Sequence, residues 1–364
     1  MSFSEKNLKD LAELALDNKA SDIHIREGEP PSFRIMGDLV PIRAKNLTVD
    51  VIQDICSILM ADNPDQLDNL DKLSEADGSY DIKNTCRLRY NFYRFQQKIG
   101  IIIRIIKYGV PSIDELGLTA RLKKIARQRR GLILVTGATG SGKSTTLAAI
   151  INEINETRHA HILTIEDPIE FIHPQINSRI SQREIGRDTD NFTDALRSAL
   201  RQDPDVILIG ELRDPETISI AMKAAETGHV VFATVHTTDA LSTISRIISM
   251  FPSTEQEYAR KRLADSLFAT ISQRMLKGRN EDVVVAQEIM VTSPGIRECI
   301  EGKEDLVNIY KFLANQEGHA NEIGQSFDSH LMRLYRRRRI SKETALEAAS
   351  SQSDFVQKLV LDEG

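Results

Sequence analysis

The chain has 364 residues, of which 41% are hydrophobic and 27% charged, and its formal net charge is −6 at pH 7. These values predict a globular protein of about two or three domains and exclude a general attraction to nucleic acid or to an anionic membrane. The three cysteines, Cys56, Cys86 and Cys299, include no CxxC pair, so we expect neither a disulfide framework nor a cysteine-based zinc site. No apolar run approaches the roughly 20 residues that span a bilayer, and the N-terminus lacks a signal-peptide pattern. We therefore expect a cytoplasmic protein without membrane insertion.

Residues 1–107 predict a small α+β domain with an antiparallel sheet. Apolar residues recur at helical spacing in two segments, while short alternating segments bounded by turn residues predict strands. The helices are expected over 7–18 and 49–60, and the strands over 21–25, 32–35, 39–42, 87–95 and 100–106. A linker is expected over 108–115.

From residue 116 to residue 364 the pattern changes to apolar strands that alternate with helices, which is typical of an α/β domain. The strands are expected over 132–135, 161–165, 206–209, 230–235 and 283–290, and the helices over 143–156, 192–202 and 214–227. Short helices are expected from residue 293 onward.

Between the first apolar strand and the helix that follows it, residues 137–145 match the phosphate-binding pattern G-x-x-x-x-G-K-[ST]. Glycines let such a loop turn its N–H groups toward phosphates, and the helix N-terminus adds positive potential. Lys143 is expected to reach the β- and γ-phosphates, and the Ser144 hydroxyl to bind Mg²⁺. The nucleotide-binding residues predicted from this loop are Gly137, Thr139, Gly140, Ser141, Gly142, Lys143, Ser144 and Thr145.

Carboxylates follow two further strands. Glu166, Asp167 and Glu170 come after the second strand, and Glu211 ends the third in a Walker B-like pattern. Ligands of an open α/β sheet collect at the carboxyl ends of its strands. Mg²⁺ binds carboxylates or their waters, and hydrolysis needs a group that orients water. The sequence therefore predicts a hydrolytic site at these strand ends.

Two histidines bracket the fourth strand: His229 precedes it and His236 follows it. His236 stands at a third catalytic strand end, where an imidazole can hydrogen-bond a phosphate. His229 is the weaker candidate on this geometry, because it lies at the beginning of the strand.

The motifs over 137–145, 162–170, 209–211 and 227–239, in this order, resemble the secretion-ATPase superfamily of type II secretion and type IV pili. Within it the chain is most similar to the PilT/PilU retraction group. The resemblance implies a RecA-like P-loop ATPase domain preceded by a smaller PAS-like domain, a homo-hexameric ring, ATP as substrate and Mg²⁺ as cofactor. It also implies docking to a pilus platform protein at the inner face of the inner membrane.

The resemblance implies roles for particular residues. Glu170 corresponds to the catalytic carboxylate, and Glu211 acts on the metal through water. Glu166 and Asp167 help to hold Mg²⁺ and water, and His229 contacts the γ-phosphate. Arginines of the N-terminal domain complete the nucleotide site in relatives, and the candidates are Arg87, Arg89, Arg94 and Arg104.

Several functions stay open. The absence of an additional N-terminal domain and of a tetracysteine site favours pilus retraction over assembly. Residues 295–301 are an imperfect copy of a retraction-motor signature, and Ala138 stands where PilT usually has Pro. Both departures favour an accessory motor like PilU, working with a paralogous ATPase. A type IV secretion or conjugation ATPase is a second enzyme alternative. The acidic charge argues against a nucleic-acid motor, and the complete motifs argue against a non-hydrolysing scaffold.

Overall fold

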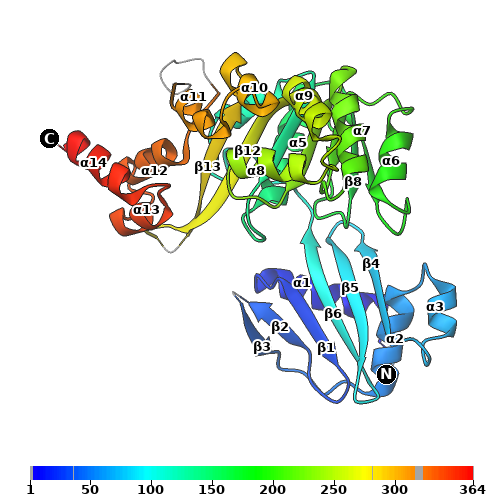
Figure 1. Cartoon of the computed structure of the whole chain (residues 1–364). Coiled ribbons are helices and arrows are strands. Elements are labelled where there is room, and N and C mark those ends of the chain that lie inside the picture. Colours follow the sequence, from blue (N-terminus) through cyan, green and yellow to red (C-terminus); the bar gives the residue numbers. More distant parts are fainter. Residues whose placement is uncertain (1–2, 36, 281, 316–322, 364) are drawn as a thin grey trace. The chain divides into compact units, whose positions relative to one another are not determined.

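The computed structural model describes residues 3–35, 37–280, 282–315 and 323–363 (Figure 1). The chain forms two compact units, Met1–Gly109 and Val110–Gly364. The division falls within the segment predicted as a linker. No helix in the described ranges is both long enough and apolar enough to cross a membrane.

The first unit is a six-stranded antiparallel sheet in the order β3-β2-β1-β6-β5-β4. Its strands are β1 (Asp22–Arg26), β2 (Ser32–Ile35), β3 (Asp38–Pro41), β4 (Glu75–Ile82), β5 (Cys86–Phe95) and β6 (Lys98–Lys107), and its helices are α1 (Glu5–Asp17), α2 (Val49–Leu59) and the short α3 (Pro64–Asp68). Strand β4 was not predicted, because only Ala76 and Ile82 of its eight residues are buried.

Buried and partly buried side chains alternate along β5, and this alternation shows which face of the sheet the helices cover. Leu88, Tyr90 and Phe92 are buried in the core shared with α1 and α2, whereas Arg87 and Arg89 are only partly buried. Successive side chains of a strand point to opposite faces. One face of the sheet therefore packs on helices, and the opposite face carries the arginines.

The second unit contains a seven-stranded sheet in the order β13-β12-β7-β11-β10-β8-β9. All neighbouring pairs are parallel except β12 and β13. The strands are β7 (Gly131–Thr136), β8 (His161–Glu166), β9 (Arg179–Glu184), β10 (Val206–Ile209), β11 (Val230–Val235), β12 (Leu267–Lys277) and β13 (Val283–Val291). Neither β9 nor β12 was predicted.

The helices of this unit are α4 (Arg121–Ala126), α5 (Lys143–Thr157), α6 (Phe192–Ala199), α7 (Pro215–Glu226), α8 (Ala240–Ser249), α9 (Gln256–Ser266), α10 (Pro294–Glu301), α11 (Ile309–Asn315), α12 (Phe327–Arg336), α13 (Lys342–Ala348) and α14 (Gln352–Glu363), with a 3₁₀ turn over Leu306–Asn308. Leu132 and Leu134 of β7 pack in the core that holds α6 to α9, and Ile133 and Val135 pack in the core that holds α4 and α5. Helices on both faces explain why the central strands are continuously apolar.

The unit is a RecA-like α/β domain whose central strands direct their carboxyl ends to one edge. Val235 of β11 lies opposite Thr136 of β7, and Ile209 of β10 lies opposite both Ala233 and Ile165. The phosphate-binding loop, His236, Glu211 and the loop after β8 follow these ends directly. Parallel pairing therefore gathers the predicted site.

Candidate active site

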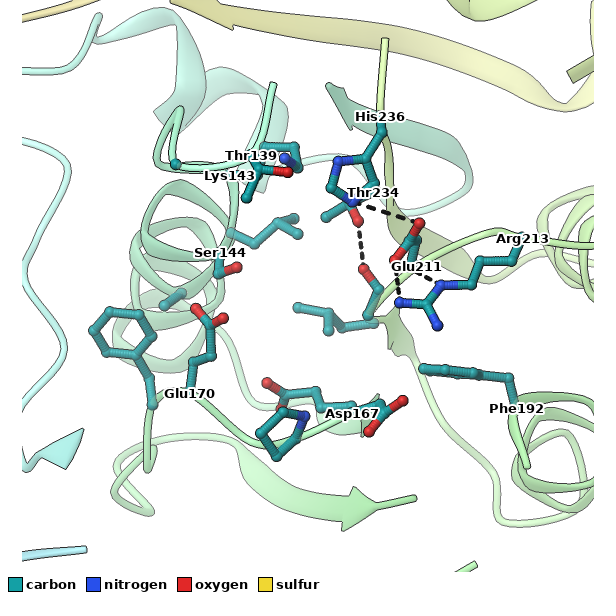
Figure 2. Close-up of a pocket in the computed structure, with 18 of the residues that line it drawn as sticks. Thr139, Lys143, Ser144, Asp167, Glu170, Phe192, Glu211, Arg213, Thr234 and His236 are labelled. Atoms are coloured by element: carbon teal, nitrogen blue, oxygen red, sulfur yellow. Dashed lines mark hydrogen bonds and ion pairs between the residues drawn. The ribbon is translucent and has the colours of Figure 1, made fainter. Parts of the chain in front are cut away.

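A cavity of about 220 Å³ lies at this edge of the sheet (Figure 2). Its walls come from the phosphate-binding loop and α5, from the loop after β8, and from the ends of β10 and β11. The predicted residues that line it are Thr139, Gly140, Lys143, Ser144, Glu166, Asp167, Glu170, Glu211 and His236.

The phosphate-binding loop places the N-terminus of α5 at this cavity. Lys143 begins the helix, and its Nζ donates to the carbonyls of Gly137 and Ala138, each at 3.0 Å. Burial lowers the pKa of the Lys143 ammonium, and the charges of Glu211 and Glu170 oppose this shift. The loop therefore holds a cation ready to exchange carbonyl oxygens for phosphate oxygens.

Other predicted loop residues contribute through the backbone. Gly137 and Gly142 have positive φ angles of 151° and 85°. A Cβ on Gly137 would lie 2.3 Å from Ser141 Oγ and 2.8 Å from the carbonyl of Gln273. Ser141 and Thr145 do not line the cavity; the Ser141 hydroxyl is buried, with no hydrogen-bond partner in the described structure.

Glu211 lies opposite the loop and is held by two neighbours. Arg213 pairs with it at 2.8 Å, and His236 Nε2 lies 3.4 Å from its Oε1 (Figure 2). The sequence did not single out Arg213, although it stands only two residues after Glu211. The pairings orient the Glu211 carboxylate at the cavity wall.

Glu166 is more enclosed than the other carboxylates. It accepts hydrogen bonds from Thr164 Oγ1 at 2.7 Å, from Gln182 Nε2 at 3.2 Å and from the backbone N–H of Glu170. Burial raises the pKa of Glu166, and these three donors oppose the rise. Its part in metal binding stays a prediction, since these internal bonds already engage the carboxylate.

The loop after β8 presents Asp167 and Glu170 as exposed side chains. Figure 2 shows Glu170 on the same side of the cavity as Ser144 of α5. Glu170 is therefore placed to act on a molecule that occupies the space between the loop and Glu211.

The structure places His229 away from this cavity, at the amino end of β11. Its Nδ1 lies 3.0 Å from the carbonyl of Ala224. The six residues of β11 separate it from His236, a span of roughly 20 Å. The structure thus places His236, and not His229, at this cavity; the contact of His229 with the γ-phosphate stays a prediction.

The arginines of the first unit differ in their surroundings. Arg89 and Arg104 are cross-strand neighbours and line a shared hollow with Asp22, to which Arg104 is paired at 2.9 Å. Arg87 donates to Ser79 Oγ at 2.8 Å. Arg94 instead donates to the carbonyls of Leu70 and Leu73, so it holds the segment before β4. A nucleotide-binding role stays a proposal for all four arginines, although the Arg94 guanidinium is already engaged within its own unit.

Sequence reasoning missed several residues of the cavity wall: Phe192, Thr234, Arg213 and His173. His173 is 7% exposed, its Nδ1 has no partner within the described residues, and burial lowers its pKa to about 4. It is therefore neutral at pH 7. The only signal for it was its position, three residues after Glu170.

The donors around the cavity fit a hard cation. Hydroxyl and carboxylate oxygens of Ser144, Asp167 and Glu211 line it, and Mg²⁺ binds oxygen ligands of this kind together with phosphate. No group of three or more His, Cys, Asp or Glu side chains in the described ranges could hold a metal by itself. A bound Mg²⁺ would therefore depend on the nucleotide phosphates as well.

The sheet, the phosphate-binding loop and the carboxylates at adjacent strand ends define a P-loop nucleoside triphosphatase. Residues 1–359 match the family described as Type II/IV secretion system protein, and the chain belongs to this family.

The chain is 41% identical, over 96% of its length and 100% of the relative, to a type IV pilus retraction ATPase, PilT, of Pseudomonas aeruginosa. It is 33% identical, over 95% of its length and 89% of the relative, to the type IV pilus ATPase PilU of the same organism. A crystal structure of the pilus retraction motor PilT with bound ADP superimposes with a TM-score of 0.86, at 36% identity, covering 95% of this chain and 98% of the other.

Proposed function

We propose that this chain is an ATP-hydrolysing motor that powers type IV pilus retraction. The observation that carries the proposal is one cavity that combines the Lys143 loop, the exposed Glu170 and the Glu211 carboxylate paired with Arg213. The chain around it is similar to PilT over 96% of its length.

In the proposed reaction, ATP places its β- and γ-phosphates against the loop and the N-terminus of α5. Lys143 neutralises phosphate charge, and His236 hydrogen-bonds the γ-phosphate. Glu170 orients a water molecule and accepts its proton as the water attacks phosphorus, releasing ADP and phosphate. Bound Mg²⁺ supplies further charge neutralisation; Ser144, Glu211, Asp167 and Glu166 would hold it directly or through water.

Motor action requires that ATP change how subunits contact one another. We propose a homo-hexamer in which Arg87, Arg89 and Arg104 act at a nucleotide site, so that ATP ties neighbouring subunits and hydrolysis releases them. The proposed partner is a pilus platform protein at the inner membrane, through which the motor is peripherally attached.

An accessory role beside a paralogous motor is the second candidate. The similarity to PilU and the imperfect signature at residues 295–301, in α10, favour it. A primary motor is expected to drive retraction by itself, whereas an accessory motor is expected to act only together with its paralogue.

The test is deletion of the gene in the source organism, complemented with wild-type protein or with Glu170→Gln. For a retraction motor, both deletion and Glu170→Gln are expected to give more surface pili and lost twitching motility. Fewer pili would indicate an assembly motor instead. Unchanged pili and motility would exclude a primary motor and favour the accessory role or secretion.

Purified Glu170→Gln protein tests the chemistry. Loss of the group that activates water is expected to lower kcat by roughly 10²- to 10⁴-fold, while ATP affinity is retained because Lys143 and the loop are unchanged. Steady-state phosphate release and equilibrium binding of a fluorescent ATP analogue measure the two quantities. Wild-type turnover in this variant would exclude Glu170 as the catalytic carboxylate.

A further inference from the structure

The loop that carries Glu170 lies beside β9, the strand at the edge of the sheet. Strand β9 pairs in parallel with β8, with Gln182 opposite Thr164 and Glu184 opposite Glu166. Gln182 and Glu184 are alternate residues, so their side chains leave the same face of β9. That face is the one turned to the loop over residues 167–173, because both side chains bond to it.

Gln182 makes the larger set of contacts. Its Oε1 accepts the N–H of His173 at 2.9 Å, and its Nε2 donates to the carbonyl of Phe171 at 2.9 Å and to Glu166 Oε1 at 3.2 Å. The amide is therefore used as both donor and acceptor. It bridges the loop to the Glu166 carboxylate at the end of β8.

Two further bonds hold the other side of Glu170. Glu184 Oε2 accepts the N–H of Ile169 at 3.2 Å, and Glu166 accepts the N–H of Glu170 itself. Backbone groups of Ile169, Glu170, Phe171 and His173 are thus fixed by side chains of two adjacent strands. The Glu170 carboxylate is exposed, so its direction depends on this fixed backbone.

We infer that Gln182 and Glu184 are positioning residues, which hold the Glu170 backbone so that its carboxylate meets the attacking water. The inference rests on the proposed catalytic role of Glu170. Neither side chain lines the cavity, so neither is expected to touch nucleotide. A general base must lie within hydrogen-bond reach of the water, and residues that support such a group from behind keep it there.

Gln182→Ala and Gln182→Met test the inference in the full-length protein. Both substitutions remove the amide, and Met keeps most of the side-chain volume. We expect kcat to fall by roughly 100-fold, the effect of misplacing a reacting group by about 1 Å, while the equilibrium affinity for a fluorescent ATP analogue stays unchanged.

Gln175 offers a matched control. Its Nε2 donates to the carbonyl of Ile180 and its Oε1 accepts the Ile180 N–H, both at 2.8 Å. It therefore makes the same two-way bond to β9 outside the cavity wall. Gln175→Ala is expected to keep the wild-type kcat. Amide hydrogen exchange of residues 167–174 should rise in the Gln182 variants and stay slow in the control.

Glu184 allows rescue by a conservative change. Glu184→Gln keeps an acceptor for the Ile169 N–H, whereas Glu184→Ala removes it. We expect the Gln variant to retain kcat near the wild-type value and the Ala variant to lose it. Equal kcat in the two variants would contradict a positioning role for Glu184.

Two results would overturn the role of Gln182. One is wild-type kcat in both Gln182 variants. The other is a parallel loss of kcat, nucleotide affinity and melting temperature, which would mark a general folding defect. Glu170→Gln, assayed alongside, separates a failure of the inference about Gln182 from a failure of the proposed role of Glu170. If it abolishes turnover while the Gln182 variants do not, only the inference fails; if it retains turnover, the role of Glu170 fails and the inference falls with it.

Discussion

Lys143 shows how a single buried charge prepares the site for anions. The residue is 8% exposed, and its ammonium donates to the carbonyls of Gly137 and Ala138. Carbonyl oxygens are neutral acceptors, so a phosphate offers this cation a stronger partner. The side chain is thereby kept in place between catalytic cycles.

Lys143→Ala is therefore expected to weaken nucleotide binding by roughly 10- to 100-fold, the loss of one or more charged hydrogen bonds. Equilibrium binding of a fluorescent ATP analogue measures this. Lys123→Ala is a suitable control, because Lys123 pairs with Asp114 outside the cavity. Retained affinity in Lys143→Ala would contradict the placement of phosphate on the loop.

Gly137 is required by its surroundings as much as by its dihedral angle. A Cβ there would lie within 3.0 Å of Ser141 Oγ and the Gln273 carbonyl. We expect Gly137→Ala to displace the loop and to abolish detectable nucleotide binding, measured by the same assay. A folded variant with normal affinity would contradict this prediction, because it would show that the loop can move and still direct its N–H groups toward the phosphates.

At the scale of elements, α12 covers one edge of the seven-stranded sheet, strand β13. His330 of α12 accepts the N–H of Gln287 on β13 at 2.9 Å. Burial lowers the pKa of His330 to about 3, with the charge of Arg333 adding to the effect. The histidine is thus neutral in the folded protein. The lone pair of its Nδ1 accepts the N–H of Gln287, a backbone donor on the edge strand.

Acid is expected to weaken this contact. Unfolded His330 titrates near pH 6.5, so between pH 6.5 and about 3 the unfolded chain binds more protons. The stabilisation is present above pH 6.5 and is lost as pH falls. Between pH 7 and pH 5 the free energy of unfolding of the wild type should fall by about 2 kcal/mol more than that of His330→Asn. The Asn side chain retains an acceptor for the Gln287 N–H but does not titrate. Denaturant unfolding at both pH values measures this difference, and equal losses would contradict it.

For the whole molecule, ATP turnover is proposed to depend on arginines of the first unit in an assembled ring. Asp22 is 5% exposed and paired with Arg104, whose side chain is 65% exposed. The same arginine is thus anchored within its own sheet and still reaches solvent. An arginine held in this way can still contact the phosphate of a nucleotide that assembly of the ring brings close to it.

Arg104→Ala is expected to lower turnover of the assembled protein at least roughly tenfold, the effect of losing a charged hydrogen bond in the transition state. Asp22→Asn breaks the same ion pair but keeps the arginine, so it should retain turnover. Phosphate release at concentrations where sedimentation shows full assembly is the measurement. Equal losses in both variants would mean that the ion pair matters only for the fold.

Local patterns were sufficient for much of the architecture. The central strands β7, β8, β10 and β11 and the helix α5 fall where continuous apolar runs and helical spacing predicted them. Strands β9 and β12 were missed because their polar residues break the apolar pattern, and Ile180 is the one buried residue of β9. Such strands form because a neighbouring strand supplies hydrogen bonds, which a local pattern does not record.

The sequence by itself determined the P-loop, the α/β class of the second unit and the set of carboxylates that follow its strands. These depend on short-range physics: glycine turns, apolar periodicity and chain direction. Tertiary structure alone decided that His236 reaches the cavity while His229 does not, that Arg94 holds its own unit, and that Gln182 braces the Glu170 loop. Those roles depend on which strands become neighbours, and parallel pairing joins segments far apart in the chain.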